Sequence, residues 1–90
     1  IMSSTSWSSY SLRRLKYNDP TLTSLDLSSM IIDDSRIISI ASSVKCNSTL
    51  TTLDLHDNLI GADGTAAIVE ALIVNTSLRS LFLNDNRSIG

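Results

Sequence analysis

Leucine recurs along the chain in short alternating segments, each with two leucines separated by one residue. The three pairs are Leu25 and Leu27, Leu53 and Leu55, and Leu81 and Leu83. A period of two places both leucines on one face of a strand and the intervening residue on the other. The pattern therefore predicts three short strands whose leucines face a core.

Between the second and third leucine pairs, apolar and small residues recur at every third or fourth position. This stripe consists of Gly64, Ala67, Ile68, Ala71 and Leu72. Such spacing is typical of a helix with one apolar face. The small residues in the stripe predict that this helix lies close to the sheet.

The whole pattern repeats with a period of 28 residues. Residues 21–48 align without gaps to residues 49–76, and nine of the 28 aligned positions are identical. A third, partial unit covers residues 77–90. Repeats of about 20 to 29 residues with the spacing LxxLxLxxN are the signature of leucine-rich repeats. Each unit is therefore predicted to contribute one short strand and one return helix.

Asparagine occupies two recurring positions of the unit. Asn58 and Asn86 end the LxLxxN spacing, and Met30 takes that place in the first unit. We predict that Asn58 and Asn86 bind backbone groups in the turn after the strand. Asn47 and Asn75 stand where the helices must stop, and we predict that they cap them in the left-handed conformation that asparagine tolerates.

The 28-residue unit resembles the long leucine-rich repeat of the ribonuclease-inhibitor type, which also occurs in NOD-like immune receptors. The resemblance covers residues 21–90 and is closest over residues 53–83. It implies an α/β solenoid, a horseshoe segment with parallel strands on the concave side and helices on the convex side. Similar proteins commonly bind macromolecules on the concave face.

Three positions depart from this family pattern. Met30 stands where the other units have Asn58 and Asn86, and Arg36 stands where the second unit has Gly64. The third unit has one extra residue within 86–90. These departures affect the local register.

Residues 1–20 do not follow the period. Seven Ser or Thr lie among residues 3–11, whereas residues 11–20 resemble the last turns of a repeat helix. One interpretation is a degraded or capping repeat, with Leu12 and Leu15 facing the core and Pro20 ending the helix. The other is a disordered, Ser-rich tail. Because Ile1 precedes Met2 and the third unit stops early, we expect a segment of a longer open reading frame.

Composition and charge argue against several classes of function. Seven Lys and Arg against nine Asp and Glu give a net charge of −2, without the basic excess that nucleic-acid binding uses. No apolar run approaches the roughly 18 residues of a membrane-spanning helix. With one Cys and one His, the chain can form neither an internal disulfide nor a structural zinc site. No cofactor is expected, since the GADG of residues 61–64 lacks the lysine of a phosphate-binding loop and indicates a turn into a helix.

The strand residues that alternate with leucine form the candidate binding surface. Parallel strands about 4.8 Å apart stack equivalent positions into columns. We define the strand face as Asp26, Ser28, Thr52, Asp54, His56, Ser80, Phe82 and Asn84. It combines carboxylates with one aromatic ring, and all seven Lys and Arg lie elsewhere, which predicts a protein partner with a basic surface. The alternative is a solvated polar face on a scaffold.

Catalytic and metal-binding interpretations of the strand face have less support. His56, Asp57 and Ser28 are the residue types of a hydrolytic triad, but adjacent residues do not point together as a base and its orienting carboxylate must. Asp26, Asp54 and His56 would provide too few converging ligands for a divalent cation on an open strand face. We therefore assign neither a catalytic residue nor a metal ligand.

Two kinds of modification site are weighed against structural roles. Asn47, Asn75 and Asn86 begin N-glycosylation motifs, although the first two occupy one repeat position that the helix stop already explains. Cys46 lies near a helix end, and we interpret it as a small hydrophobic residue rather than a reactive thiol.

We predict a non-enzymatic protein-interaction module of a cytoplasmic protein, the latter because the chain shows no signal-peptide pattern. The alternative is a GTPase-activating regulator resembling the Ran GTPase activator, whose chemistry needs a loop asparagine that no residue here matches specifically. A purely structural solenoid segment without a partner is the third hypothesis.

Overall fold

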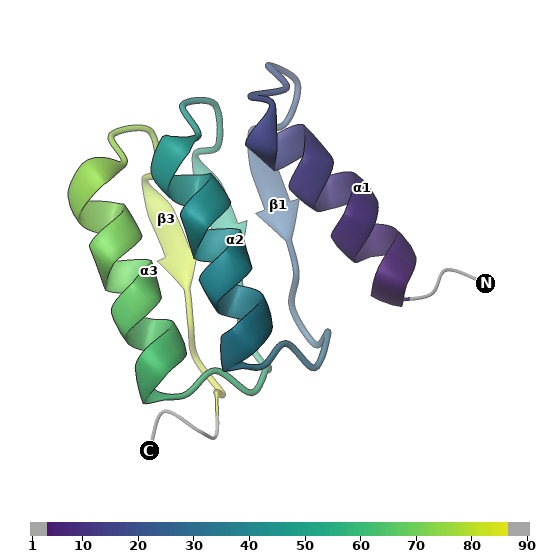
Figure 1. The fold of residues 1–90 in the computed structure, drawn as a ribbon, viewed down its shortest axis with the longest axis vertical. Coiled ribbons are helices and arrows are strands. Elements are labelled where there is room, and N and C mark those ends of the chain that lie inside the picture. Colours follow the sequence, from purple (N-terminus) through teal and green to yellow (C-terminus); the bar gives the residue numbers. More distant parts are fainter. Residues whose placement is uncertain (1–3, 87–90) are drawn as a thin grey trace.

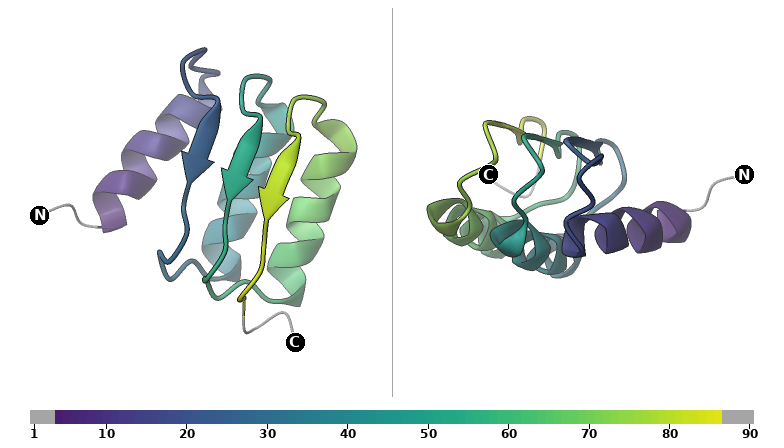
Figure 2. Two further views of the ribbon diagram at one scale, coloured as in Figure 1. Left: turned by 180° about the vertical axis from the view of Figure 1, so that it is seen from behind. Right: turned by 90° about the horizontal axis from the view of Figure 1, so that it is seen from above.

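Three strands and three helices alternate along the chain. In this computed structural model, residues 4–86 are described, with side chains from residue 10 onward. The elements are α1 (Ser4–Lys16), β1 (Ser24–Asp26), α2 (Asp34–Cys46), β2 (Thr52–Asp54), α3 (Ala62–Val74) and β3 (Ser80–Phe82). The strands form one parallel sheet in the order β1-β2-β3. The helices line one face of this sheet, and the other face is uncovered (Figures 1 and 2).

The register of the sheet follows the 28-residue period. Ser24, Thr52 and Ser80 are aligned across the three strands, and so are Asp26, Asp54 and Phe82. The predicted columns along the strands are confirmed. Because a one-residue slip would turn every leucine to the wrong face, the buried leucines hold this register in place.

The core is aliphatic, and the leucine pairs face it as predicted. Leu25, Leu27, Leu53 and Leu55 are buried, while Leu81 and Leu83 in the third unit pack against the core in part. Burying one such side chain stabilises the fold by about 1.5–3 kcal/mol, so the leucine pairs and the isoleucines around them carry most of the stability.

Gly64 provides a close contact between helices rather than between helix and sheet. A Cβ atom at this position would lie 2.5 Å from Asp34 Oδ1, 2.5 Å from Ile37 Cγ2 and 2.9 Å from Ile60 Cγ2. The prediction that small residues bring α3 close to the sheet is therefore wrong for Gly64. The first turn of α3 packs against the side chains of Asp34 and Ile37 in the first turn of α2, and only glycine leaves room for them.

The helix α1 packs beside α2 and contributes to the core. Leu15 is fully buried and Leu12 is partly buried, as predicted. The helix ends four residues before Pro20, so proline does not end it. Asn18 adopts a left-handed conformation with φ of 54°, and the Asp19 amide donates to the Arg14 carbonyl at 3.0 Å. This is a Schellman motif, in which the left-handed residue terminates the helix.

Asn47 and Asn75 end their helices in a different way from the one predicted. Their φ values of −85° and −71° belong to extended backbone, not to the left-handed region. The Asn75 amide group donates to the carbonyls of Val44 at 2.7 Å and Asn47 at 2.8 Å, and its oxygen accepts from the Leu78 amide at 2.7 Å. An extended backbone lets one side chain join two helix ends to the next strand.

Asn58 binds backbone groups in the turn after its strand, as predicted, and also binds the turn of the preceding unit, so that it forms a ladder between units. It is buried, its amide group donates to the carbonyls of Leu27 and Leu55 at 3.0 Å, and its oxygen accepts from the amides of Met30 and Ile32 at 3.0 and 2.9 Å. Asn86 repeats part of this pattern one unit later. The extra residue expected in the third unit falls within 86–90, of which residues 87–90 lie outside the described part of the chain.

The outer side of α3 is more exposed than the equivalent side of α2. Ala41 and Val44 on α2 are 4% and 3% exposed, whereas Val69 and Leu72, their equivalents 28 residues later, are 51% and 37% exposed. Helix α3 covers the first pair, and no described element covers the second. Leu72 thus lies at the margin of the predicted stripe rather than within the core.

Replacing Asn58 with alanine should lower the free energy of unfolding by about 3–5 kcal/mol, because four backbone groups, three of them in buried contacts, would lose a partner at once. Urea unfolding followed by circular dichroism measures the change. Asn84→Ala is the matched control: Asn84 is exposed, so we expect a change within about 0.5 kcal/mol. Equal losses for both variants would contradict the role of the ladder.

Adding one further repeat after β3 should raise the melting temperature and sharpen the transition, because it would bury the outer side of α3 and the free edge of β3. A consensus repeat with glycine at the position of Gly64 is the appropriate unit. The same repeat with lysine at that position should stabilise less. A melting curve unchanged by either addition would show that the edge needs no cover.

Candidate functional site

Five strand-face residues lie within the strands, where the alternation turns the leucines to the core and their neighbours to the side opposite the helices. The other three, Ser28, His56 and Asn84, lie two residues beyond the strand ends. Phe82, on the edge strand β3, is 48% exposed and is aligned with Asp54 on the central strand. The role of this face in binding remains a prediction.

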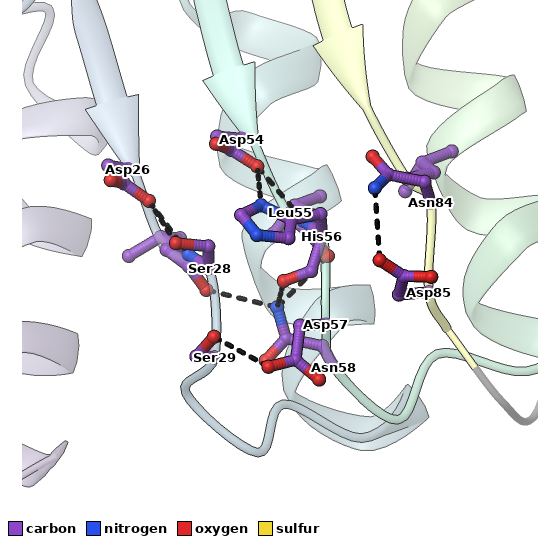
Figure 3. Close-up of polar contacts among 12 residues, drawn as sticks. Asp26, Ser28, Ser29, Asp54, Leu55, His56, Asp57, Asn58, Asn84 and Asp85 are labelled. Carbon is purple, nitrogen blue, oxygen red and sulfur yellow. Dashed lines mark hydrogen bonds and ion pairs between the residues drawn. The ribbon is translucent and has the colours of Figure 1, made fainter.

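A recurring contact orders the polar residues at the ends of the first two strands (Figure 3). Asp26 Oδ1 accepts from the Ser28 amide at 3.0 Å and from Ser28 Oγ at 2.6 Å. One unit later, Asp54 Oδ1 accepts from the His56 amide at 3.0 Å and from His56 Nδ1 at 2.8 Å. In the third unit Phe82 replaces the aspartate, and Asn84 donates to Asp85 instead, at 3.2 Å.

The contact between His56 and Asp54 shifts the pKa of both groups. The hydrogen bond to Asp54 raises the pKa of His56 above its usual 6.5, and the charges of Asp54, Asp57 and Asp26 add to this effect. Hydrogen bonds from the His56 amide and imidazole lower the pKa of Asp54 below its usual 3.8. Both side chains are about one-third exposed, at 37% and 27%, so solvent screens the pair.

The geometry does not form a hydrolytic triad. His56 binds Asp54 rather than Asp57, and the hydroxyl of Ser28 is bound to Asp26 on its own strand. Ser28 is thus not activated by the imidazole, as a nucleophile would have to be. Within residues 4–86, no three His, Cys, Asp or Glu residues are grouped closely enough to hold a metal ion.

The loops after the strands contain residues in the left-handed conformation that the sequence pattern did not predict. Ser29, Asp57 and Asp85, at equivalent positions, have φ values of 55°, 56° and 61°, and Ser29 Oγ donates to Asp57 Oδ2 at 2.7 Å. Ile31 also has a positive φ of 57°, which is rare for a β-branched residue and costs about 1–3 kcal/mol. A polar residue recurs just before the position of Asn58 and Asn86 in every unit, and this pattern could have predicted the left-handed conformation of Ser29, Asp57 and Asp85. Nothing in the sequence predicts it for Ile31.

The predicted modification sites differ in their accessibility. The side-chain amide of Asn47 is buried and donates to the Leu15 carbonyl at 2.8 Å, and those of Asn75 and Asn86 also bind backbone carbonyls. These amides are therefore occupied and poorly placed to accept a glycan. Cys46 is exposed at the end of α2, whereas Val44 in the preceding turn is buried. The interpretation of Cys46 as a small hydrophobic residue rather than a reactive thiol stays a prediction.

None of the helices between residues 4 and 86 combines the length and the apolar character needed to cross a bilayer.

The chain is similar to known proteins in sequence and in structure. A family model described as a leucine-rich repeat matches residues 46–69, which cover the end of α2, the strand β2 and the first half of α3. These residues are similar to a leucine-rich repeat. Thirteen chains of solved structures match it. Among them is actin-binding site 2 of leiomodin-1, with a TM-score of 0.71 and 27% identity, over 100% of this chain and 68% of that one. No curated protein matches.

Replacing Asp54 with asparagine should lower the pKa of His56, because the hydrogen bond to the Asp54 carboxylate is the largest cause of the raised pKa. Proton NMR titration of the imidazole measures this. Asp57→Asn should lower the pKa less, and Asp63→Asn on α3 should leave it unchanged.

The free energy of unfolding should depend on pH through the same two residues, His56 and Asp54. Because folding raises the pKa of His56, its contribution is complete below pH 6.5 and is lost as the pH rises through the raised value. Because folding lowers the pKa of Asp54, its contribution is present above pH 3.8 and is lost as the pH falls through the lowered value. A titration of His56 at or below 6.5 in the parent protein would contradict the contact.

Proposed function

We propose that this chain is a protein-interaction module that binds its partner through the strand face. The observation that carries the proposal is the exposed ring of Phe82, aligned with Asp54 on a sheet face that none of the helices within residues 4–86 covers. Aromatic residues contribute disproportionately to binding energy at protein interfaces. Carboxylates beside such an anchor favour a partner with a basic surface and speed its approach.

We also propose that the repeat is of the ribonuclease-inhibitor type and that the chain forms a horseshoe solenoid. The strands begin at Ser24, Thr52 and Ser80, 28 residues apart, and a 13-residue helix separates each pair of strands. A full helix on one side of a short parallel strand makes the helical side wider than the strand side. Repetition of this unit supports a curved solenoid with the strand face inside.

The module is proposed to act without catalysis and in the cytoplasm. Its polar residues bind one another in pairs rather than as a base and a nucleophile. Cys46 is an exposed free thiol, which suits a reducing compartment. The occupied amides of Asn47 and Asn75 support a compartment without N-glycosylation.

Actin is a second candidate partner, and one observation favours it. The chain aligns over its full length with actin-binding site 2 of leiomodin-1. Co-sedimentation with filamentous actin and gel filtration with monomeric actin test this directly. Binding that depends on Phe82 would unite both proposals, whereas no binding in either assay would remove actin and leave the strand face open to another protein.

Substitutions on the strand face should distinguish residues that slow dissociation of the partner from charges that speed its association. A partner is first captured on the immobilised chain and purified. Phe82→Ala should then mainly speed the dissociation of this partner, by about tenfold or more. The double variant Asp26→Asn with Asp54→Asn should mainly slow association and flatten its dependence on salt, since the Debye length falls from about 10 Å at 0.1 M to about 3 Å at 1 M. Surface plasmon resonance gives both rates.

The helical side supplies the controls. Lys45 and Glu70 face each other across α2 and α3 at 3.8 Å and are both exposed, so Lys45→Ala and Glu70→Ala should change neither rate. Binding that survives every strand-face substitution but is lost in either control would place the partner on the helices.

A further inference from the structure

A groove beside the strand face combines exposed apolar side chains with a carboxylate. We call it the loop groove and define it by the five residues that line it: Ser29, Ile31, Asp57, Asn58 and Leu59. Its volume is about 240 Å³. It lies where the chain leaves β1 and β2 toward the next helices (Figure 3).

The ladder asparagine forces the apolar residues of the groove outward. The amides of Met30 and Ile32 both donate to Asn58 Oδ1, and the Leu59 amide donates to the Ile32 carbonyl at 2.8 Å. Ile31 lies between two pinned residues, so it takes the left-handed conformation and its side chain is 76% exposed. Leu59, held on the other side of the groove, is 43% exposed. This arrangement keeps two aliphatic side chains in water at a cost in strain.

Asp57 provides the charge of the groove. Ser29 Oγ donates to Asp57 Oδ2, which fixes the carboxylate and leaves Oδ1 without a bond among the described residues. The residues that line the groove include no Lys or Arg. His56 is near enough for the charges of Asp57 and Asp26 to act on it, but its imidazole is bound to Asp54. The groove therefore lacks a cationic partner for a carboxylate held in place.

We propose that the loop groove binds an arginine side chain of the protein partner. The guanidinium group would pair with Asp57, and its aliphatic stem would lie along Ile31 and Leu59. Arginine suits this site better than lysine, because its planar, weakly hydrated head fits a carboxylate and its stem covers apolar surface. The inference rests on the proposed function and adds a chemical feature that the partner must carry.

A short peptide tests the groove without any knowledge of the partner. The probe is a Gly-Ser peptide with one central arginine, and the matched control carries citrulline, which keeps the shape and loses the charge. In ¹⁵N-labelled protein at low salt, the arginine peptide should shift the amide signals of Ser29, Ile31, Asp57 and Leu59. Equal shifts with citrulline, or shifts spread over the helices, would overturn the proposal.

Two substitutions examine the two halves of the site. Asp57→Asn preserves the left-handed backbone, since asparagine tolerates it, and should weaken binding of the arginine peptide about tenfold. Asp85→Asn is the matched control, with the same conformation one unit later and outside the groove, and should have no effect. Ile31→Gly should weaken binding about threefold while the melting temperature stays equal or rises, because glycine removes the strain. Equal affinity of the Asp57 and Asp85 variants would overturn the assignment.

The purified partner distinguishes failure of the groove from failure of the proposed function. If Phe82→Ala weakens partner binding and Asp57→Asn does not, the strand face holds and the groove proposal fails. If the arginine peptide binds the groove but no partner binding depends on the strand face, the groove holds and the proposed function fails. Loss of partner affinity in both variants supports both.

Discussion

The buried amide of Asn58 is the interaction on which the rest of the structure depends. A short strand followed by a sharp turn leaves backbone groups of neighbouring units facing one another inside the molecule, where unpaired groups cost about 1–3 kcal/mol each. One asparagine has two donor hydrogens and an oxygen with two lone pairs, which is enough to satisfy four such groups. Asn58 does so for Leu27, Met30, Ile32 and Leu55, and thereby couples one repeat to the next.

The same constraint determines what the protein offers to a partner. Where Asn58 gathers two amides on one oxygen, the residue between them must point outward, and the chain exposes Ile31 beside Asp57. Where the leucine pairs face the core, the residues between and after them form a polar surface on the open side of the sheet. Both candidate binding surfaces are thus consequences of how the repeats pack, which explains why they are adjacent.

The charges on this surface are ordered by contacts within the chain. Asp26 and Asp54 each accept two hydrogen bonds from the residue two positions later, so their carboxylates are held in one orientation. A carboxylate that is already oriented loses less conformational entropy when a cationic partner arrives. Pre-organisation, rather than a closed pocket, is what this fold contributes to the proposed recognition.

The sequence by itself determined the repeat, the strands, the buried leucines and the role of Asn58, because each depends on periodic spacing that a linear pattern records. It also placed the strand residues that alternate with leucine on one side of the sheet. Only the tertiary structure decided that Asn18, and not Asn47, takes the left-handed conformation, that Gly64 serves a contact with α2, and that Ile31 is exposed under strain. These features arise where backbone and side-chain groups 26 to 32 residues apart compete for the same hydrogen-bond donor, acceptor or space. A local sequence pattern does not predict which contact forms.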